Sequence, residues 1–497
     1  MKLKVKDMDV ATGEVLVAVM NEHDAALFDL HLADRVKLKR GNKEVITVVD
    51  FAESENIVPK GSIGLFEEVL DKLSTKDGDI VNMSVTNKPI SLTYIKNKMD
   101  GKELKYEEVR EIINDTVSNM ITMVELTYYV AANYMRGMSF RETVALTRAM
   151  IDAGKKIKLD AKIVVDKHCI GGVAGNRTTM ISVPILTAAG LAMPKTSSRS
   201  ITSPAGTADT MEIIANVNLS MKEILSTIKK TGGCMVWGGA VDLAPADDTI
   251  INIEHPLSID AEGQLLASIM AKKGSVSATH LLVDIPVGKD AKIESMKEAK
   301  HLGRQFEKLG KAIGIKTKVI ITDGSQPIGN GIGPALEARD VMWLLKGDKR
   351  APQDLREKSI YVSGLLLEMC GKAKKGRGMQ MAEDIIGSCK AYHQFMAIAR
   401  AQGLKIKDEK DIYIGEHTYN YIAEKSGTVR HISNKDISKV ARIAGCPKDK
   451  GAGIYLYRHK GDRVEKGDKL FTIYADTKEK LKFAKQTLLE IDGVEIR

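Results

Sequence analysis

Short apolar runs alternate with polar positions along the first ninety residues of the chain. The runs EVLVAVM, RVKLKR and EVITVVDF are separated by turns that contain Gly or Asp. A two-residue period places apolar side chains on one face of a strand, and frequent turns keep such strands short. The pattern predicts a small β-rich domain over residues 1–90.

The periodicity becomes helical between Leu104 and Gly154. The segment SFRETVALTRAMIDAG opens with Ser139 and Glu142, which have the spacing of a capping box, and ends at Gly154, a residue typical of C-caps. After it, strand-like runs (KIVVD, HLLVDIPVG, KTKVIITDG) alternate with helix-like runs. This alternation predicts a largely parallel sheet covered by helices. From about Gly415 the short, Gly-punctuated strands indicate a separate C-terminal α+β domain.

Composition narrows the class of protein. A chain of 497 residues is long enough for three or four domains. We expect a cytoplasmic protein, because the N-terminus has no apolar leader and the run MISVPILTAAGLAMP is too short to span a bilayer. The five cysteines lie far apart, which does not fit a zinc site or a disulfide framework. The net charge of +9 is spread along the chain and aromatic residues make up only 5%, so we expect no nucleic-acid partner.

The first candidate for chemistry is DKHCIGGVAGNRTT, which follows the strand-like run KIVVD and precedes a helical run. Gly171 and Gly172 allow the backbone to approach an anion closely, and a helix N-terminus offers free N–H groups. The stretch lacks the motifs of a Walker A loop and of a dinucleotide fold. It is either a phosphate-binding loop or a plain tight turn.

The second candidate is TSSRSITSPAGTADT, residues 196–210, which holds eight Ser or Thr residues in fifteen positions. It also lies between a short apolar run and a helix-compatible segment, so both loops should lie at the carboxyl ends of strands, where α/β sheets bind ligands. Hydroxyls, backbone N–H groups and one Arg form a cradle for an anion. The alternative is a Ser/Thr-rich surface linker.

A third segment, SIDAEGQLLASIMAKKG, has Asp260 before a helix that carries Ser268 and Lys272 on one face. An Asp in that place is ordinarily an N-cap, and Lys289 and Lys292 of DIPVGKDAKIES are ordinarily solvated lysines. Spacing alone leaves both alternatives open.

Together these segments resemble the type II nucleoside phosphorylases, the family of the thymidine and pyrimidine-nucleoside phosphorylases. DKHCIGGVA matches the family's D-K-H-S-T-G-G-V-G, with Cys169 where relatives have Ser, and SSRSITSPAGTADTME keeps the frame of S-G-R-x-L-x-x-x-G-G-T-x-D-x-x-E. Further matches are GMSFRETVALTRAM, VDIPVGKDAK, SQPIGNGIGPALEARD and AIARAQG. The resemblance covers most of the chain from about Tyr106 onward.

Two departures point to one branch of that family. IEHPLSID stands where the pyrimidine enzymes have an Arg-Asp pair, and TSPAG replaces G-H-T-G-G. With the additional N-terminal domain, these changes resemble the archaeal AMP phosphorylase branch, which implies phosphorolysis of a nucleoside 5′-monophosphate to the free base and ribose 1,5-bisphosphate. AMP, CMP and UMP all remain open as substrates.

The resemblance also implies an α/β fold with α+β parts: a helical domain and an α/β domain around a cleft, between the two small terminal domains. We expect the helical domain over residues 91–165 and about 245–275, the α/β domain over 166–244 and 276–410, and the C-terminal domain over 411–497. The family suggests a homodimer or a larger homo-oligomer.

The resemblance implies roles for single residues. Asp260 matches the proton donor. The nucleotide-binding positions match Gly172, Ser198, Arg199, Ser200, Ile201, Thr202, Ser203, Thr207, Ser268 and Lys292. We assign inorganic phosphate, a co-substrate, to the first loop, with Lys167, His168, Gly171 and Lys272, although the two loops could exchange roles. No cofactor, metal or membrane is expected.

Three alternatives stay open from the sequence. The chain could act on unphosphorylated nucleosides, or it could be a nucleotide-binding module without activity. A phosphoribosyltransferase of the anthranilate type would need an acidic magnesium site, and we find no paired carboxylate motif in the corresponding segment.

Overall fold

The structure is a computed structural model that describes residues 1–13, 16–86, 88–200, 203–241, 243–257, 259, 261–491 and 493–497. The described residues divide into two units: Met1–Ala153 with Ala244–Ser268, and Gly154–Leu243 with Ile269–Arg497. Among them, no helix is both long and apolar enough to cross a lipid bilayer.

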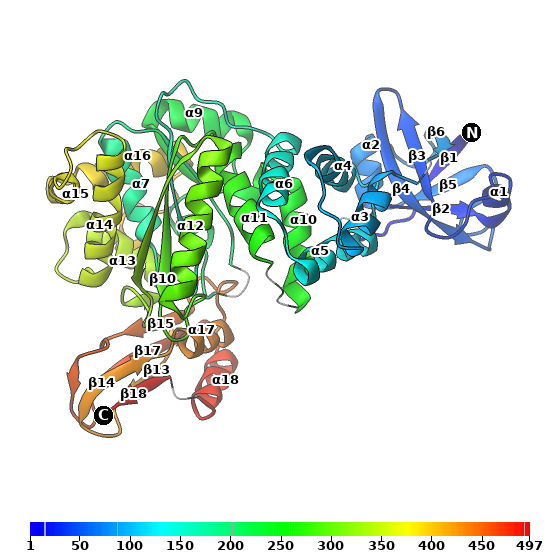
Figure 1. Ribbon diagram of the computed structural model, residues 1–497. Coiled ribbons are helices and arrows are strands. Elements are labelled where there is room, and N and C mark those ends of the chain that lie inside the picture. Colours follow the sequence, from blue (N-terminus) through cyan, green and yellow to red (C-terminus); the bar gives the residue numbers. More distant parts are fainter. Residues whose placement is uncertain are drawn as a thin grey trace. The chain divides into compact units, whose positions relative to one another are not determined.

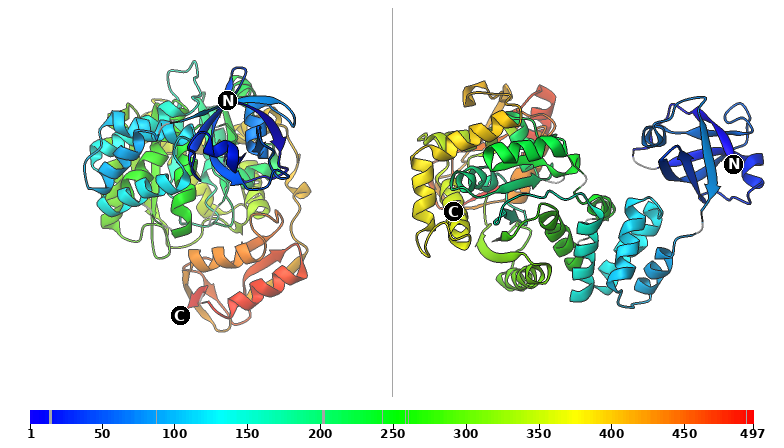
Figure 2. Two further views of the ribbon diagram at one scale, coloured as in Figure 1. Left: turned by 90° about the vertical axis from the view of Figure 1, so that its right-hand side faces the viewer. Right: turned by 90° about the horizontal axis from the view of Figure 1, so that it is seen from above.

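The alternating N-terminal segments form a closed barrel in the strand order β1-β5-β2-β4-β3-β6, drawn in blue in Figures 1 and 2. Val36 and Leu38 of RVKLKR, and Val45 and Val49 of EVITVVDF, are buried inside it, as the two-residue period predicts. The elements of this part are β1 (Lys2–Asp7), β2 (Val17–Asn21), α1 (Glu22–Ala26), β3 (Arg35–Arg40), β4 (Lys43–Ala52), β5 (Ser62–Leu65), α2 (Glu67–Leu73) and β6 (Ile80–Val85).

The rest of the first unit is helical. The predicted capping box is present, because the Ser139 N–H donates to Glu142 Oε2 (2.9 Å) and the Glu142 N–H donates to Ser139 Oγ (3.1 Å). A buried ion pair between Lys98 and Glu142 (2.7 Å) joins two of the helices. The helices are α3 (Ser91–Met99), α4 (Tyr106–Val117), α5 (Met123–Arg136), α6 (Phe140–Ala153) and α10 (Pro245–Glu254), together with the first part of α11 (Glu262–Ser275).

The second unit contains the parallel sheet. Its strands are β7 (Val165–Cys169), β8 (Met193–Ser197), β9 (Gly233–Trp237), β10 (His280–Val287) and β11 (Lys316–Asp323). All the pairings are parallel, and a bridge between Val164 and Ala192 joins β7 to β8, which gives the order β11-β10-β7-β8-β9. Fully buried residues of β7, β8 and β10 pack with those of helices in one hydrophobic core.

The helices of this unit cover the sheet (Figure 1). They are α7 (Thr178–Ala188), α8 (Thr207–Ile214), α9 (Met221–Thr231), α12 (Met296–Ile313), α13 (Pro334–Lys346), α14 (Gln353–Met369), α15 (Gly378–Gly387) and α16 (Lys390–Ala401). The second predicted capping box, Ser220 with Glu223, opens α9.

The C-terminal segment forms antiparallel sheets in the orders β12-β15-β17-β13 and β16-β14-β18. Its elements are β13 (His417–Ile422), β14 (Gly427–Ile432), α17 (Asn434–Ile443), β15 (Gly453–Leu456), β16 (Arg463–Val464), β17 (Lys469–Ala475), α18 (Lys478–Leu488) and β18 (Val494–Ile496). The strand β12 (Gly331–Ile332) comes from the α/β part, so this segment is built onto that part of the chain.

Candidate active site

The loops predicted to carry chemistry lie at one edge of the parallel sheet, where the strands end. The chain passes from β7 to β8 and β9 on one side, then returns to β10 and β11 on the other side. The strand order therefore reverses between β7 and β10. Such a switch point opens a crevice at the carboxyl ends of the strands, which is where α/β sheets bind ligands.

The Gly-rich loop after β7 lies directly against the loop after β10. Gly171 and Gly172 have φ angles of +96° and +84°, a region that favours glycine. A Cβ atom on Gly172 would stand 2.1 Å from the backbone N of Lys292, whereas one on Gly171 would meet nothing within 4 Å. Gly171 and Gly172 come from one predicted segment and Lys292 from another. The switch point therefore brings these two segments together.

Buried cations surround the end of β7. Lys195 Nζ lies 3.0 Å from Asp166 Oδ1, and Lys273 Nζ lies 2.8 Å from Asp166 Oδ2, all three side chains being almost fully buried. Burial opposes ionisation of Asp166, but the two ammonium groups overcome it and hold the pKa of this carboxyl below its ordinary value. Burial lowers the pKa of Lys273 to about 7, so this side chain can gain or lose its proton near neutral pH.

Lys167 and His168 occupy a place that differs from the expected one. We expected them in the loop, yet β7 continues to Cys169, so both are strand residues. The parallel pairing with β10, which registers Lys167 against Leu282 and His168 against Val283, extends the strand. The pattern KIVVD could not reveal this extension, because the following residues are charged.

The Lys167 side chain is buried, and the negative charge of Asp284 favours its charged form. Lys167 is 1% exposed. Burial lowers its pKa. Burial also lowers the pKa of His168 well below the ordinary value, assisted by Lys273, Lys195 and Lys272, so this imidazole is neutral at pH 7. A phosphate bound beside Lys167 would favour the charged form of this side chain.

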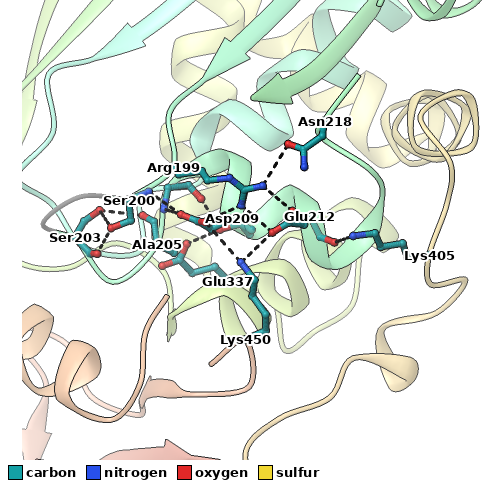
Figure 3. A network of polar contacts seen from close by, with 12 residues as sticks. Arg199, Ser200, Ser203, Ala205, Asp209, Glu212, Asn218, Glu337, Lys405 and Lys450 are labelled. Atoms are coloured by element: carbon teal, nitrogen blue, oxygen red, sulfur yellow. Dashed lines mark hydrogen bonds and ion pairs between the residues drawn. The ribbon is translucent and has the colours of Figure 1, made fainter. Parts of the chain in front are cut away.

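The hydroxyl-rich loop after β8 is closed by one carboxylate (Figure 3). Asp209 Oδ2 accepts the N–H groups of Ser200 (2.7 Å) and Gly206 (2.9 Å), which stand at the two ends of the loop. The hydroxyls of Ser200 and Ser203 lie 3.2 Å apart, and Ser203 Oγ donates to Ala205 O (3.1 Å). The described residues on both flanks of the loop, Ser200 and Gly206, are therefore held by the same carboxylate oxygen.

Arg199, which we expected to donate to an anion, pairs with a carboxylate in this structure. Its guanidinium forms a bidentate pair with Glu212 (2.8 and 2.7 Å) and stacks over Trp237, 5.1 Å from the ring centre. The hydrogen bonds from Arg199 lower the pKa of Glu212 to about 2. In this structure, the charge of Arg199 is thus used to hold the base of the loop.

Arg177 links the two loops. It ends the Gly-rich loop as the N-cap of α7, and its guanidinium donates to Ala205 O of the hydroxyl-rich loop and to the buried carboxylate of Glu337. Glu337 also accepts from Thr210 Oγ1 (3.0 Å). The two loops, which were predicted to act in the same reaction, therefore lie next to each other at the sheet edge.

The remaining predicted residues are distributed as follows. Thr207 is the first residue of α8, and Ser268 and Lys272 lie four residues apart on α11, as predicted. Ile201, Thr202 and Asp260 lie outside the described residues. Within the described part of the chain, no group of three or more His, Cys, Asp or Glu side chains could hold a metal ion.

Sequence reasoning missed the residues that shape the loops rather than face a ligand. Asp209 stands three residues after Gly206, which is capping-box spacing, and that signal was available in the sequence. Glu212, Arg177 and Glu337 lie in segments that match the family, but nothing in those segments indicates which residues they contact.

Comparison with known proteins identifies the family. Residues 92–154 match the helical bundle domain of a glycosyl transferase family, residues 161–392 match its α/β domain, and residues 428–491 match the pyrimidine nucleoside phosphorylase C-terminal domain. AMP phosphorylase 1 of Archaeoglobus fulgidus is 46% identical over 93% of this chain and 91% of its own length. The AMP phosphorylase of Methanocaldococcus jannaschii is 45% identical over 97% of this chain and 95% of its own.

The chain belongs to the AMP phosphorylase family. Its relatives also include a putative thymidine phosphorylase of Legionella pneumophila, 41% identical over 97% of this chain and 93% of its own length. Anthranilate phosphoribosyltransferase from Thermus thermophilus shares the fold, with a TM-score of 0.52 and 18% identity over 62% of this chain and 98% of its own. The predicted fold class, a helical and an α/β domain with small terminal domains, is confirmed.

Proposed function

We propose that this protein is a pentosyltransferase that cleaves nucleoside 5′-monophosphates with inorganic phosphate, converting AMP and phosphate to adenine and ribose 1,5-bisphosphate. CMP and UMP are further candidate substrates. The family supports the reaction class, because curated AMP phosphorylases match almost the full chain. We further propose a cytoplasmic homodimer or larger homo-oligomer, on the strength of the family resemblance, and no cofactor.

One observation carries the proposal: the switch point of the sheet joins a Gly-rich loop, the Lys292 backbone and buried lysines. Both substrates carry phosphate groups. A backbone that can approach closely, with lysine side chains nearby, is what phosphate binding needs in the absence of a metal.

The two loops take different substrates in this proposal. The Gly-rich loop, with Gly171, Lys167, His168 and Lys272, holds inorganic phosphate. The nucleotide contacts the hydroxyl-rich loop, together with Gly172, Thr207, Ser268 and Lys292. The neighbouring position of the loops at one sheet edge, linked by Arg177, agrees with a reaction between the two ligands.

Cleavage of the glycosidic bond builds positive charge on the ribose and negative charge on the departing base. Inorganic phosphate supplies the attacking oxygen, and a proton delivered to the base stabilises the leaving group, typically by about 10² to 10⁴ in rate. We assign that proton to Asp260 from the family resemblance. His168, whose pKa is strongly lowered, is suited to donate a hydrogen bond to phosphate as a neutral imidazole.

The test is chromatographic. The full chain is incubated with AMP, CMP, UMP, adenosine or thymidine, with and without inorganic phosphate, and the free base is quantified. We expect phosphate-dependent release of adenine from AMP and little release from either nucleoside. Faster release from adenosine or thymidine would favour the nucleoside phosphorylase alternative, to which the putative thymidine phosphorylase relatives draw attention.

Two lysines of one loop provide a matched pair of variants. Both Lys289 and Lys292 have exposed side chains, but the backbone of Lys292 alone meets the Gly-rich loop. We expect Lys292→Met to lower kcat/KM about 10²-fold or more, because a charge-assisted contact to a phosphate is lost, and Lys289→Met to leave it unchanged. Equal effects of both variants would argue against a ligand at this switch point.

A further inference from the structure

The C-terminal segment, residues 417–497, sends polar side chains to the loops of the candidate active site. No residue of this segment was predicted to take part in the reaction. In the structure, Asn434, His431 and Lys450 each contact a different part of the sheet edge. All of these contacts lie within the second unit.

Asn434 bridges two loops with a single amide. Its Oδ1 accepts the N–H of Ala174 (3.1 Å), two residues after Gly172, and its Nδ2 donates to Gly324 O (2.9 Å) in the loop after β11. The residue is 2% exposed. Replacing it would leave two buried backbone groups without partners, so these loops would have to move to reach water.

His431 contacts a third loop, the one after β10. Its Nε2 lies 3.0 Å from Asp290 Oδ2, two residues before Lys292. Asp290 itself has a φ angle of +66°, an uncommon conformation for a residue other than glycine. The contact from His431 helps to fix the loop whose backbone packs against Gly172.

Lys450 reaches the hydroxyl-rich loop (Figure 3). Its Nζ lies 3.0 Å from Glu212 Oε2 and 3.6 Å from Asp209 Oδ1. These are the carboxylates that hold Arg199 and close the loop. Lys450 therefore supplies a positive charge behind the loop, away from the hydroxyls of Ser200 and Ser203.

We propose that the C-terminal segment sets the geometry of both anion-binding loops, with Asn434 positioning the phosphate side and Lys450 positioning the nucleotide side. This inference rests on the proposed function. Neither residue is placed in contact with a substrate. Each acts through a loop, and displacement of a substrate-binding loop by about 1 Å is enough to reduce turnover strongly.

The experiment measures the two Michaelis constants separately in the full-length protein. We expect Asn434→Ala to raise KM for phosphate about tenfold, the loss typical of one or two hydrogen bonds, and to raise KM for AMP by a smaller factor, because Gly172 of the same loop is assigned to the nucleotide. Lys450→Met should raise KM for AMP about threefold to fivefold, as for a half-exposed ion pair. Lys450→Arg should restore it.

Two control variants test for a merely structural role. Asn420 bonds to Thr472 within the C-terminal segment, and Lys448 is exposed beside Lys450. Asn420→Ala and Lys448→Met should leave both constants unchanged. If Asn434→Ala does not fold, Asn434→Asp replaces it, because it keeps the acceptor for the Ala174 N–H and loses the donor to Gly324 O, and KM for phosphate should again rise.

The outcomes separate the two proposals. An active wild-type protein whose Asn434 and Lys450 variants show a lower melting temperature but unchanged KM values would overturn this inference alone. Wild-type protein that releases no adenine from AMP with phosphate would overturn the proposed function, and this inference with it.

Discussion

The two loops at the sheet edge are held in their shapes by different forces. The Gly-rich loop depends on steric fit, because Gly172 leaves no room for a Cβ atom against the Lys292 backbone. The hydroxyl-rich loop depends on charge, because the ionised carboxylates of Asp209 and Glu212 hold its ends and Arg199. Two neighbouring loops that are both proposed to bind phosphate groups are therefore held by different interactions. A different substitution tests each loop.

The largest effect should come from the steric fit. In Gly172→Ala the added methyl group would overlap Lys292 N, so the loops must separate, and we expect kcat/KM to fall about 10²-fold or more. Gly171→Ala is the matched control: it also requires a positive φ, which costs about 1–2 kcal/mol, but it meets nothing. Steady-state kinetics and thermal unfolding of both variants measure the difference. Equal losses of activity would show that conformation alone, and not close approach, limits this loop.

A smaller effect should come from the carboxylate that closes the second loop. Asp209→Asn keeps the shape, and its amide oxygen can still accept both loop N–H groups, but the charge that faces Arg199 is lost and an NH₂ donor takes the place of Oδ1. We expect the free energy of unfolding to fall by about 2–3 kcal/mol and KM for AMP to rise about tenfold. Urea unfolding and kinetics with AMP and phosphate varied in turn check this expectation.

The exposed capping-box partner Glu223 provides the control, because Glu223→Gln also removes a carboxylate from the first turn of a helix but lies away from the loop. It should change stability less than Asp209→Asn does and leave both KM values unchanged. A rise in KM for phosphate equal to that for AMP would contradict the division of roles between the loops.

The smallest expected effect is a pH dependence of stability that distinguishes the charge-held loop from the Gly-rich loop. The pKa of Glu212 is lowered from 4.5 to about 2, chiefly by its hydrogen bonds from Arg199. A lowered folded-state pKa contributes stability above about pH 4.5 that is lost as the pH falls toward 2. Between pH 6 and pH 3, the stability advantage of wild type over Glu212→Gln should therefore shrink by about 1 kcal/mol, since solvent screens part of the interaction. The stability advantage of wild type over Gly171→Ala should stay constant over the same pH range. If the stabilities of the two variants change with pH in the same way, the loop is not held by charge.

Much of the fold was predictable from local patterns. The strands of the barrel, both capping boxes and the strand-to-helix order of the sheet follow from residues that are close in sequence. The position of both loops at the carboxyl ends of the strands follows from the same local patterns. The family motifs named the Gly-rich loop, the hydroxyl run and Lys292 as functional, and these stay together in the structure where the residues are described.

The sequence could not show which loop residues are available to contact a ligand and which pair with other residues of the protein. Arg199 was expected to face an anion, yet it pairs with Glu212, and the polar strand residues Lys167 and His168 were expected in a loop. These differences share a cause, because the sequence does not show whether the partner of a charged side chain is a ligand or a neighbouring residue.

By itself, then, the sequence determined the elements, the family motifs and the positions where backbone flexibility is required, since these depend on short-range periodicity and on residue type. Only the tertiary structure decided that Gly172 meets Lys292, that Asp166 is flanked by Lys195 and Lys273, and that Asn434 spans two loops. Those contacts join residues that are tens to hundreds of positions apart. They exist because parallel strands align their carboxyl ends at one edge, a relation that the linear order of residues does not display.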